Sequence, residues 1–451
     1  MTSATVSVAS VSARNEWLSG DIASRIGEWA AGFEPTAAQL ERVSASIRDF
    51  AACVVAGTRR PELRPAMWLA HGGGVPVWGL ADSFDPAGAA LVCGTAGALL
   101  QLHDVYRPGG LHPSSPIIPA AWSALHSLGV GRSEHFVRAV ALGYEVANRF
   151  ALACTPGQVA SGSTPTATAG ALGAAISSAV VAGYDAVGIA RAVSNSALFM
   201  PIVPFLTMTT HGALAPLHGG LAARAGFEAA RVSRDASAGS SLLEGTAQMP
   251  GLIALLGGDP KRLIPESWDG GTLDQIAWKF FPACLSSITA LEAILRLEPV
   301  AVESIERITM RLPDRMLSLV DGGPDAGHLY DRLMSLRWVT ARAIEQGRYD
   351  AADAGTDSQV ATQLAQRIEI IHAPMLDELQ DQLAADIELR SEAGIQRIEY
   401  RRGIDAEPST PGPRGWTSTL DVIALEEKFL ALVGPGAVAG LETTLKFLKV
   451  A

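Results

Sequence analysis

The segment 103–112 carries the densest set of chemically active side chains in the sequence. It holds two imidazoles (His103 and His112), one carboxylate (Asp104) and one guanidinium (Arg107). A carboxylate that holds a neighbouring imidazole in one tautomer prepares that imidazole to act as a general base. A guanidinium can bind a substrate carboxylate through two parallel hydrogen bonds. These residue types therefore indicate acid/base chemistry.

His112 is the residue that we predict to be the base. Pro113 follows it, and a helix-like apolar run covers residues 118–128. Because proline disfavours the α conformation in the residue before it, His112 should have an extended backbone just ahead of a new helix, whose first N–H groups carry partial positive charge. That environment keeps an imidazole neutral. The structural alternative is a histidine that only caps or hinges the helix.

The neighbours of His112 have structural interpretations as well. Adjacent residues on a helix point to different faces, which weighs against the expected acid/base pair of His103 and Asp104. An arginine in a loop, such as Arg107, is often solvated or paired for structural reasons. Both interpretations stay open at the level of the sequence.

The composition is that of a large globular enzyme. The chain has 451 residues, of which 48% are hydrophobic and 18% charged, so it can bury a large core and should form about two or three domains. Its net charge of −11 opposes binding to nucleic acid, and it has no dinucleotide-binding glycine motif, P-loop or HExxH motif. His103, His112, His211 and His218 share no i, i+4 spacing. We therefore expect a small-molecule substrate, no nucleic-acid partner, no cofactor and no metal.

The cysteines and the apolar stretches indicate in which cellular compartment the protein is expected. The four cysteines are Cys53, Cys93, Cys154 and Cys284. They lie far apart in apolar surroundings, as buried free thiols do, and form no CxxC pair. The first residues lack the basic patch and apolar block of a secretory signal, and the apolar stretches 88–102 and 167–183 are shorter than the roughly 20 residues of a membrane span. We expect no membrane association and a cytoplasmic location.

Helical periodicity dominates the first two-thirds of the chain. Helices are predicted over residues 36–55, 133–152, 165–183, 184–196 and 217–230. Thr36 and Gln39 have the spacing of a capping box, which marks the start of the first of these helices. Residues 167–183 are apolar on every side and therefore predict a buried central helix.

Residues 263–407 follow a different pattern. Strands are predicted at 304–312 and 395–400, and helices at 329–345 and 357–368. Two amphipathic helices, 420–433 and 437–448, then return to the earlier pattern and should pack on the first domain. The predicted fold is mainly α with an α+β insert. It comprises an all-helical domain of residues 1–262 and 408–451 and a smaller α+β lid domain of residues 263–407.

Six short motifs carry a resemblance to a known family. They are residues 112–115 (HPSS) with 118–120, 143–146 (GYEV), 165–170 (PTATAG), 217–220 (LHGG) with 222–226, 279–284 (KFFPAC) and 426–429 (EEKF). In this order they resemble motifs of the MmgE/PrpD family, which includes 2-methylcitrate dehydratase, cis-aconitate decarboxylase and iminodisuccinate epimerase. The resemblance spans nearly the whole chain.

The resemblance implies a fold and a chemistry. The fold is an all-helical domain closed from both ends of the chain with a smaller α+β lid, and the protein is a homodimer that needs no cofactor. In such enzymes a base removes a proton α to a carboxylate, and the carbanion then expels hydroxide, loses carbon dioxide or is reprotonated on its other face. His112 matches the family base, Lys279 matches a family lysine that would neutralise a substrate acid, and His218 matches a family histidine.

The sequence departs from the family pattern at several positions that would face the substrate. Thr164 and Ile288 stand where relatives have histidine, Ala215 stands where they have lysine, and Trp338 stands where the lid has a tyrosine. Segment 101–105 keeps one of the family's carboxylates and loses its hydroxyl. Each unpaired charge of a buried tricarboxylate would cost several kcal/mol in such a pocket.

We therefore predict a cofactor-independent lyase or isomerase that abstracts a proton α to a carboxylate or carbonyl. Its substrate should be less charged and more hydrophobic than a tricarboxylate, as in specialised biosynthesis. The predicted catalytic residues are His112, His103, Asp104 and Lys279, and the predicted substrate-binding residues are Arg107, His211, His218, Thr164 and Trp338.

Two alternatives remain open. One is an ordinary polycarboxylate hydro-lyase or epimerase, similar to 2-methylcitrate dehydratase, whose cations come from other positions. At least three cationic side chains around His112 would favour it. The other is a non-catalytic homologue that acts as a binding protein, which a closed and wholly apolar pocket would favour.

Overall fold

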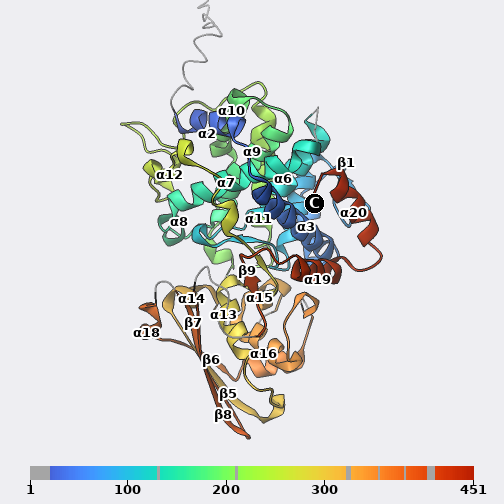
Figure 1. Ribbon diagram of the computed structural model, residues 1–451, viewed down its shortest axis with the longest axis vertical. Coiled ribbons are helices and arrows are strands. Elements are labelled where there is room, and N and C mark those ends of the chain that lie inside the picture. The colour runs from blue at the N-terminus through green and yellow to red at the C-terminus, as the bar shows by residue number, and fades with distance from the viewer. Residues whose placement is uncertain are drawn as a thin grey trace, which may run out of the picture.

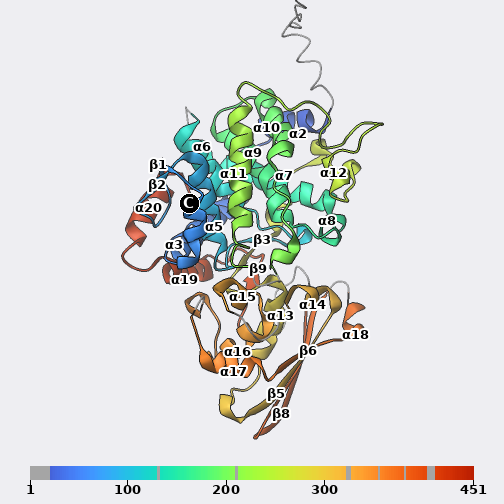
Figure 2. The same cartoon turned by 180° about the vertical axis from the view of Figure 1, so that it is seen from behind.

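The computed structural model describes residues 21–128, 133–208, 212–320, 327–353, 356–379, 382–403 and 412–450. The chain forms two lobes, a helical lobe and a smaller lid lobe that contains the main sheet (Figures 1 and 2). Each lobe has its own cluster of buried apolar side chains. Within the described residues, none of the helices has both the length and the apolar character that crossing a membrane requires. This architecture confirms the predicted fold class.

The helical lobe is built around α9 (Pro165–Val181), in which every residue is buried. The helices that pack most closely against it are α6 (Ser114–Ser127), α7 (Phe136–Cys154) and α11 (Leu217–Val232). Glycines let these backbones approach closely, because a Cβ on Gly143 of α7 would lie 2.7 Å from the carbonyl oxygen of Gly173. The prediction of a buried central helix is confirmed.

The remaining helices of this lobe surround that centre. They are α2 (Ile22–Gly32), α3 (Ala37–Thr58), α4 (Arg64–Trp68), α5 (Pro86–Ala98), α8 (Gly157–Ala160), α10 (Ala186–Phe199) and α12 (Leu252–Leu255), with the hairpin of β1 (Gly72–Pro76) and β2 (Ser83–Phe84). The predicted capping box is present, because Thr36 and Gln39 exchange hydrogen bonds at the start of α3. From the other end of the chain, α19 (Val422–Val433) packs on α3, and α20 (Val438–Phe447) contributes to the same core. The prediction that the C-terminal helices return to the first lobe is confirmed.

The lid lobe contains a four-stranded sheet in the order β6–β5–β7–β8. Its strands are β5 (Ile305–Leu312), β6 (Ile368–His372), β7 (Gln382–Ser391) and β8 (Gly394–Gly403). Strand β5 is parallel to β6, whereas the other pairs are antiparallel. The helices of this lobe are α13 (Leu285–Ile294), α14 (Asp314–Val320), α15 (Leu329–Met334), α16 (Leu336–Gln346), α17 (Gln359–Ala365) and α18 (Pro374–Asp377).

Two expectations for the lid lobe need correction. The single helix predicted over residues 329–345 is broken into α15 and α16, because Ser335 lies between them with an extended backbone and its hydroxyl caps α16 at the N–H of Trp338. Strands β6 and β7 were not predicted, whereas the strands predicted at 304–312 and 395–400 correspond to β5 and β8.

A small antiparallel sheet joins the lobes. It consists of β3 (Val105–Tyr106), β4 (Ile276–Lys279) and β9 (Trp416–Thr417), in the order β3–β4–β9. The sheet lies where the two lobes meet (Figure 2). It brings the segment 103–112 beside Lys279, which is far away in the sequence. The domain limits predicted from the sequence remain a prediction.

Candidate active site

A cavity of about 260 Å³ lies between the two lobes. The helical lobe contributes Gln101, Val105, Arg107, Gly110, His112, Val159, Thr164, Thr166, Phe205, Met208 and His218, and the lid lobe contributes Cys284, Leu285, Ser286, Leu319, Tyr330 and Met334. About half of these side chains are apolar, and the others are polar or charged. Four of the predicted site residues, His112, His218, Arg107 and Thr164, line this cavity.

The backbone fixes the orientation of His112. Helix α6 begins at Ser114, four residues earlier than predicted, so His112 lies just before its first turn. The backbone N–H of His112 donates to Oγ1 of Thr166 at 3.1 Å, and its ring Nδ1 lies 2.8 Å from the carbonyl oxygen of Asp104. A carbonyl oxygen can only accept, so Nδ1 carries the proton and Nε2 keeps a lone pair.

His112 is uncharged near neutral pH. Burial lowers the pKa of His112 to about 3, and the nearby amine of Lys279 adds to this effect. The ring is therefore in the form that can accept a proton. The geometry and the charge state both suit a general base.

His103 lies directly behind this base. Its ring centroid is 4.6 Å from that of His112, and the side chain has no exposed surface. Burial holds the pKa of His103 well below its ordinary value, and neither ring nitrogen has a hydrogen-bond partner among the described residues. Buried polar atoms of this kind are commonly satisfied by ordered water.

The expected pair of His103 and Asp104 does not form. The Asp104 carboxylate instead accepts hydrogen bonds from the hydroxyl of Tyr144 at 2.9 Å and from the backbone N–H of Ser114 at 3.2 Å. The two neighbouring side chains point in different directions, which is why the pair is absent. Burial raises the pKa of Asp104 to about 6. Asp104 therefore acts on His112 through its backbone carbonyl and not through its carboxylate.

Two buried lysines lie near this group. Lys428 is paired with Asp49 at 2.5 Å and donates to the carbonyl oxygen of Leu102 at 2.7 Å. The amine of Lys279, in contrast, is fully buried and has no hydrogen-bond partner among the described residues. Burial lowers the pKa of Lys279 to about 7, so both of its protonation states are populated near neutral pH.

His218 resembles His112 in its local geometry. It lies in the first turn of α11, and its Nδ1 donates to the carbonyl oxygen of Ala215 at 2.6 Å. Burial lowers the pKa of His218. The cavity therefore has two neutral imidazoles, each with the proton on Nδ1 and a lone pair on Nε2.

The other predicted binding residues have different positions. Arg107 lines the cavity and stacks its guanidinium on the ring of Trp416 at 4.6 Å, and Thr164 precedes the first turn of α9. Trp338 does not line the cavity but is buried in the core of the lid lobe. His211 lies outside the described residues.

A contact between the lobes could not be predicted from the sequence. The amide of Gln101 donates to the hydroxyl of Tyr330 at 2.7 Å, and that hydroxyl lies 3.2 Å from the sulfur of Met208. Gln101 has a left-handed backbone (φ 54°), which is uncommon for a residue other than glycine. A tyrosine of the lid lobe therefore does line the cavity, but it lies eight positions before Trp338. Matching the sequence to the family pattern without gaps pointed to Trp338 and could not find Tyr330.

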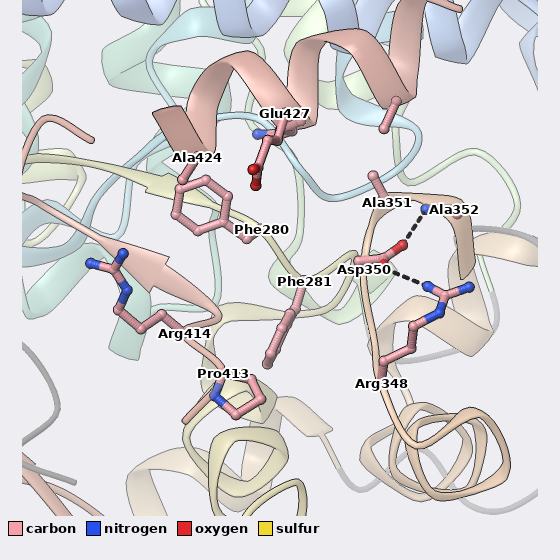
Figure 3. A pocket seen from close by; sticks show the side chains of 12 residues that line it. Phe280, Phe281, Arg348, Asp350, Ala351, Ala352, Pro413, Arg414, Ala424 and Glu427 are labelled. Atoms are coloured by element: carbon pink, nitrogen blue, oxygen red, sulfur yellow. Dashed lines mark hydrogen bonds and ion pairs between the residues drawn. The ribbon is translucent and has the colours of Figure 1, made fainter. Parts of the chain in front are cut away.

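A larger groove of about 560 Å³ lies between the lid lobe and α19 (Figure 3). Phe280 and Phe281 line it, and its two guanidiniums are paired, that of Arg348 with Asp350 and that of Arg414 with Asp421. The groove contains no imidazole. We therefore place the candidate active site in the smaller cavity.

Two family profiles match the sequence over most of its length. The profile of the MmgE/PrpD N-terminal domain matches residues 24–262, and that of the MmgE/PrpD C-terminal domain matches residues 281–443. The chain belongs to the MmgE/PrpD family. No curated protein matches the sequence. Membership in the MmgE/PrpD family indicates a function of the lyase or dehydratase type.

The cavity takes residues from both regions that the MmgE/PrpD profiles match. Residues 101–218 of its lining fall in the N-terminal profile, and residues 284–334 fall in the C-terminal profile. Across the described part of the chain, no group of three or more histidine, cysteine or acidic side chains has the arrangement of a metal site.

Proposed function

We propose that this protein is a lyase or isomerase in which His112 removes a proton from the carbon next to a carboxylate or carbonyl group. The resulting carbanion then expels a leaving group, loses carbon dioxide or takes a proton back. The proposed reaction uses no metal or cofactor, because His112 serves as the base and Lys279, buried near it, serves as the proton donor.

One observation carries this proposal. The hydrogen bond from Nδ1 of His112 to the Asp104 carbonyl fixes the tautomer of a neutral imidazole that lines the cavity. A base must be unprotonated and must present a lone pair, and His112 meets both requirements before substrate binds. A pocket with such a histidine also favours an enzyme over a non-catalytic binding protein.

Lys279 and His103 are the proposed partners of this base. Since the pKa of Lys279 is about 7, its ammonium form can stabilise the negative charge of an enolate-like intermediate or return a proton. The ring of His103 lies against that of His112, and its unpartnered nitrogens can exchange protons with ordered water. We propose that Asp104 positions His112 and that His218, Thr164 and Arg107 contact the substrate.

The lining of the cavity supports a substrate of low charge. Arg107 is the one arginine or lysine among the described lining residues, and His218 is neutral there. Of the other basic groups near His112, the two histidines are uncharged near neutral pH, Lys279 is only partly charged, and the charge of Lys428 is balanced by Asp49. Three cations around the base are therefore not available, which favours a monocarboxylate or dicarboxylate with an apolar part over a tricarboxylate.

Exchange of hydrogen in D₂O tests the proposed reaction. The enzyme is incubated with small carboxylic acids that carry an apolar group, and replacement of the α-hydrogen is followed by NMR. We expect exchange with the wild-type protein and with His126→Ala, a control on the same helix, and none with His112→Ala. Equal exchange by His112→Ala would show that another residue is the base.

We also propose that the protein is cytoplasmic and, from family membership, that it is a homodimer. Several large apolar side chains on and after α10 are exposed, including Leu198, Ile202 and Leu206. Large apolar side chains that stay exposed are candidates for an interface with another protein chain. Light scattering of the purified protein tests the proposal, and the mass of a monomer at micromolar concentration would contradict it.

A further inference from the structure

Cys284 differs from the other three cysteines in its surroundings. Cys53, Cys93 and Cys154 have no exposed surface and lie in the core of the helical lobe. Cys284 is 9% exposed and lines the candidate cavity together with His112 and Tyr330. Of the four thiols, only this one lines the cavity in which a small acid would bind.

The residues around Cys284 suit a nucleophile. Cys284 immediately precedes α13, and hydrogen bonds from Ser286 and Ser287 in the first turn of this helix favour the thiolate. Burial raises the pKa of the Cys284 thiol, and the positive charge of Lys279 opposes that effect.

Lys279 is the second unusual side chain at this site. Its amine is fully buried, lacks a hydrogen-bond partner among the described residues and has Cys284 as its leading electrostatic partner. A neutral lysine can take the proton of the thiol, and the ammonium that results can attract a carboxylate. The same pair of residues therefore combines a nucleophile with a group that binds an acid.

We propose that Cys284 is a covalent capture site for α,β-unsaturated carboxylates that enter the cavity. Lys279 takes the thiol proton, the sulfur forms a bond to the β-carbon, and the electrons of the double bond move to the α-carbon. The ammonium of Lys279 then returns the proton to the α-carbon. The sum is addition of S–H across the double bond, with no oxidant or reductant.

The proposed reaction could itself supply an unsaturated acid for this capture. Elimination next to a carboxylate produces an unsaturated acid in the cavity that Cys284 lines, so accumulated product would block the enzyme. This role rests on the proposed function, whereas the capture of an added alkene rests only on the geometry around Cys284 and Lys279.

Intact-protein mass spectrometry tests the capture. The full chain is incubated with monomethyl fumarate, which carries a carboxylate, or with dimethyl fumarate, its uncharged counterpart. Each rate is divided by the rate of the same reagent with glutathione. We expect one adduct per chain, located at Cys284 by peptide mapping, and a preference for the charged reagent of about tenfold, the effect of one favourable charge contact.

Variants distinguish this site from others. Cys284→Ser should form no adduct, and Cys93→Ser should react like the wild type. Lys279→Met removes the group that takes the thiol proton, so it should react more slowly and without a preference for the charged reagent. His112→Ala should still be labelled although we expect it to be inactive, so a failure of the capture is separable from a failure of the proposed reaction. An adduct on any other cysteine, the absence of an adduct, or an equal preference for both reagents would overturn the proposal.

Discussion

The two walls of the cavity hold their reactive side chains by different means. On the helical wall, His112 and His218 each donate Nδ1–H to a backbone carbonyl of their own lobe. On the lid wall, Tyr330 is held by the side chain of Gln101, which belongs to the opposite lobe. The first arrangement depends only on how one lobe folds, whereas the second depends on how the lobes meet. We therefore expect the helical wall to carry proton transfer and the lid wall to retain the substrate.

The largest expected effect tests the helical wall. His112→Ala should lower kcat by about 10²- to 10⁴-fold, because it removes the general base. KM should change little, since the imidazole is proposed to act on the transition state more than on the bound substrate. Steady-state kinetics with a substrate found by the exchange assay would measure both constants. A raised KM with an unchanged kcat would instead make His112 a binding residue.

Lys279→Met should separate stability from activity. The pKa of Lys279 is lowered from 10.5 to about 7, so the charged amine destabilises the folded state, and that cost is complete below pH 7 and vanishes as the pH rises to 10.5. The variant should therefore gain about 1–4 kcal/mol in the free energy of unfolding at pH 7, and the gain should shrink at higher pH.

Urea unfolding at several pH values would measure this gain, and turnover should fall at the same time. A conservative Lys279→Arg variant keeps a charge and should not show the gain. Equal stability of Lys279→Met and the wild type at pH 7 would contradict the placement of an unpartnered amine in the interior.

Tyr144→Phe tests how Asp104 is held. Removing the hydroxyl leaves the buried carboxylate with one donor fewer, which should cost about 1–3 kcal/mol of stability. Because the carbonyl of Asp104 orients His112, kcat should also fall. Tyr184→Phe, at a half-buried tyrosine outside the cavity, is the matched control and should change stability by less than about 0.5 kcal/mol. An unaltered kcat in Tyr144→Phe would mean that His112 is oriented without this contact.

Tyr330→Phe is expected to have the smallest effect and tests the lid wall. Loss of one neutral hydrogen bond corresponds to about 0.5–1.5 kcal/mol, so KM should rise about two- to tenfold while kcat stays close to the wild-type value. Gln101→Leu should have a similar effect, and the double variant should be no worse than either single one. A large loss of kcat in Tyr330→Phe would place proton transfer on the lid wall as well.

Local patterns predicted much of the helical lobe. The small apolar residues of α9 indicated a helix buried on every side, and Thr36 with Gln39 marked the start of α3. The strands of the lid lobe were harder to predict. The residues of β6 form a short apolar run, and such a run can occur in a buried helix as well as in a strand. In β7 the alternation is weakened by alanines at positions 384 and 385, which are both buried.

The site shows the same division between local and distant information. His112 could be found from its own neighbours, because proline and the following helix determine its surroundings. The partners of Asp104 and Gln101 could not, since Tyr144 and Tyr330 are distant in sequence and approach only when the chain folds. Trp338 was assigned by counting along the chain, and a burial pattern cannot tell a core tryptophan from one that faces a cavity.

The charge and tautomer of His112 can be measured directly. Long-range ¹⁵N–¹H NMR spectra of protein labelled in its histidines, assigned with His112→Ala, distinguish the three forms of the ring. We expect a neutral ring with the proton on Nδ1 from neutral pH down to about pH 4, because burial lowers the pKa of His112 to about 3. A ring that is protonated at pH 6, or that carries its proton on Nε2, would contradict the assignment of His112 as the base.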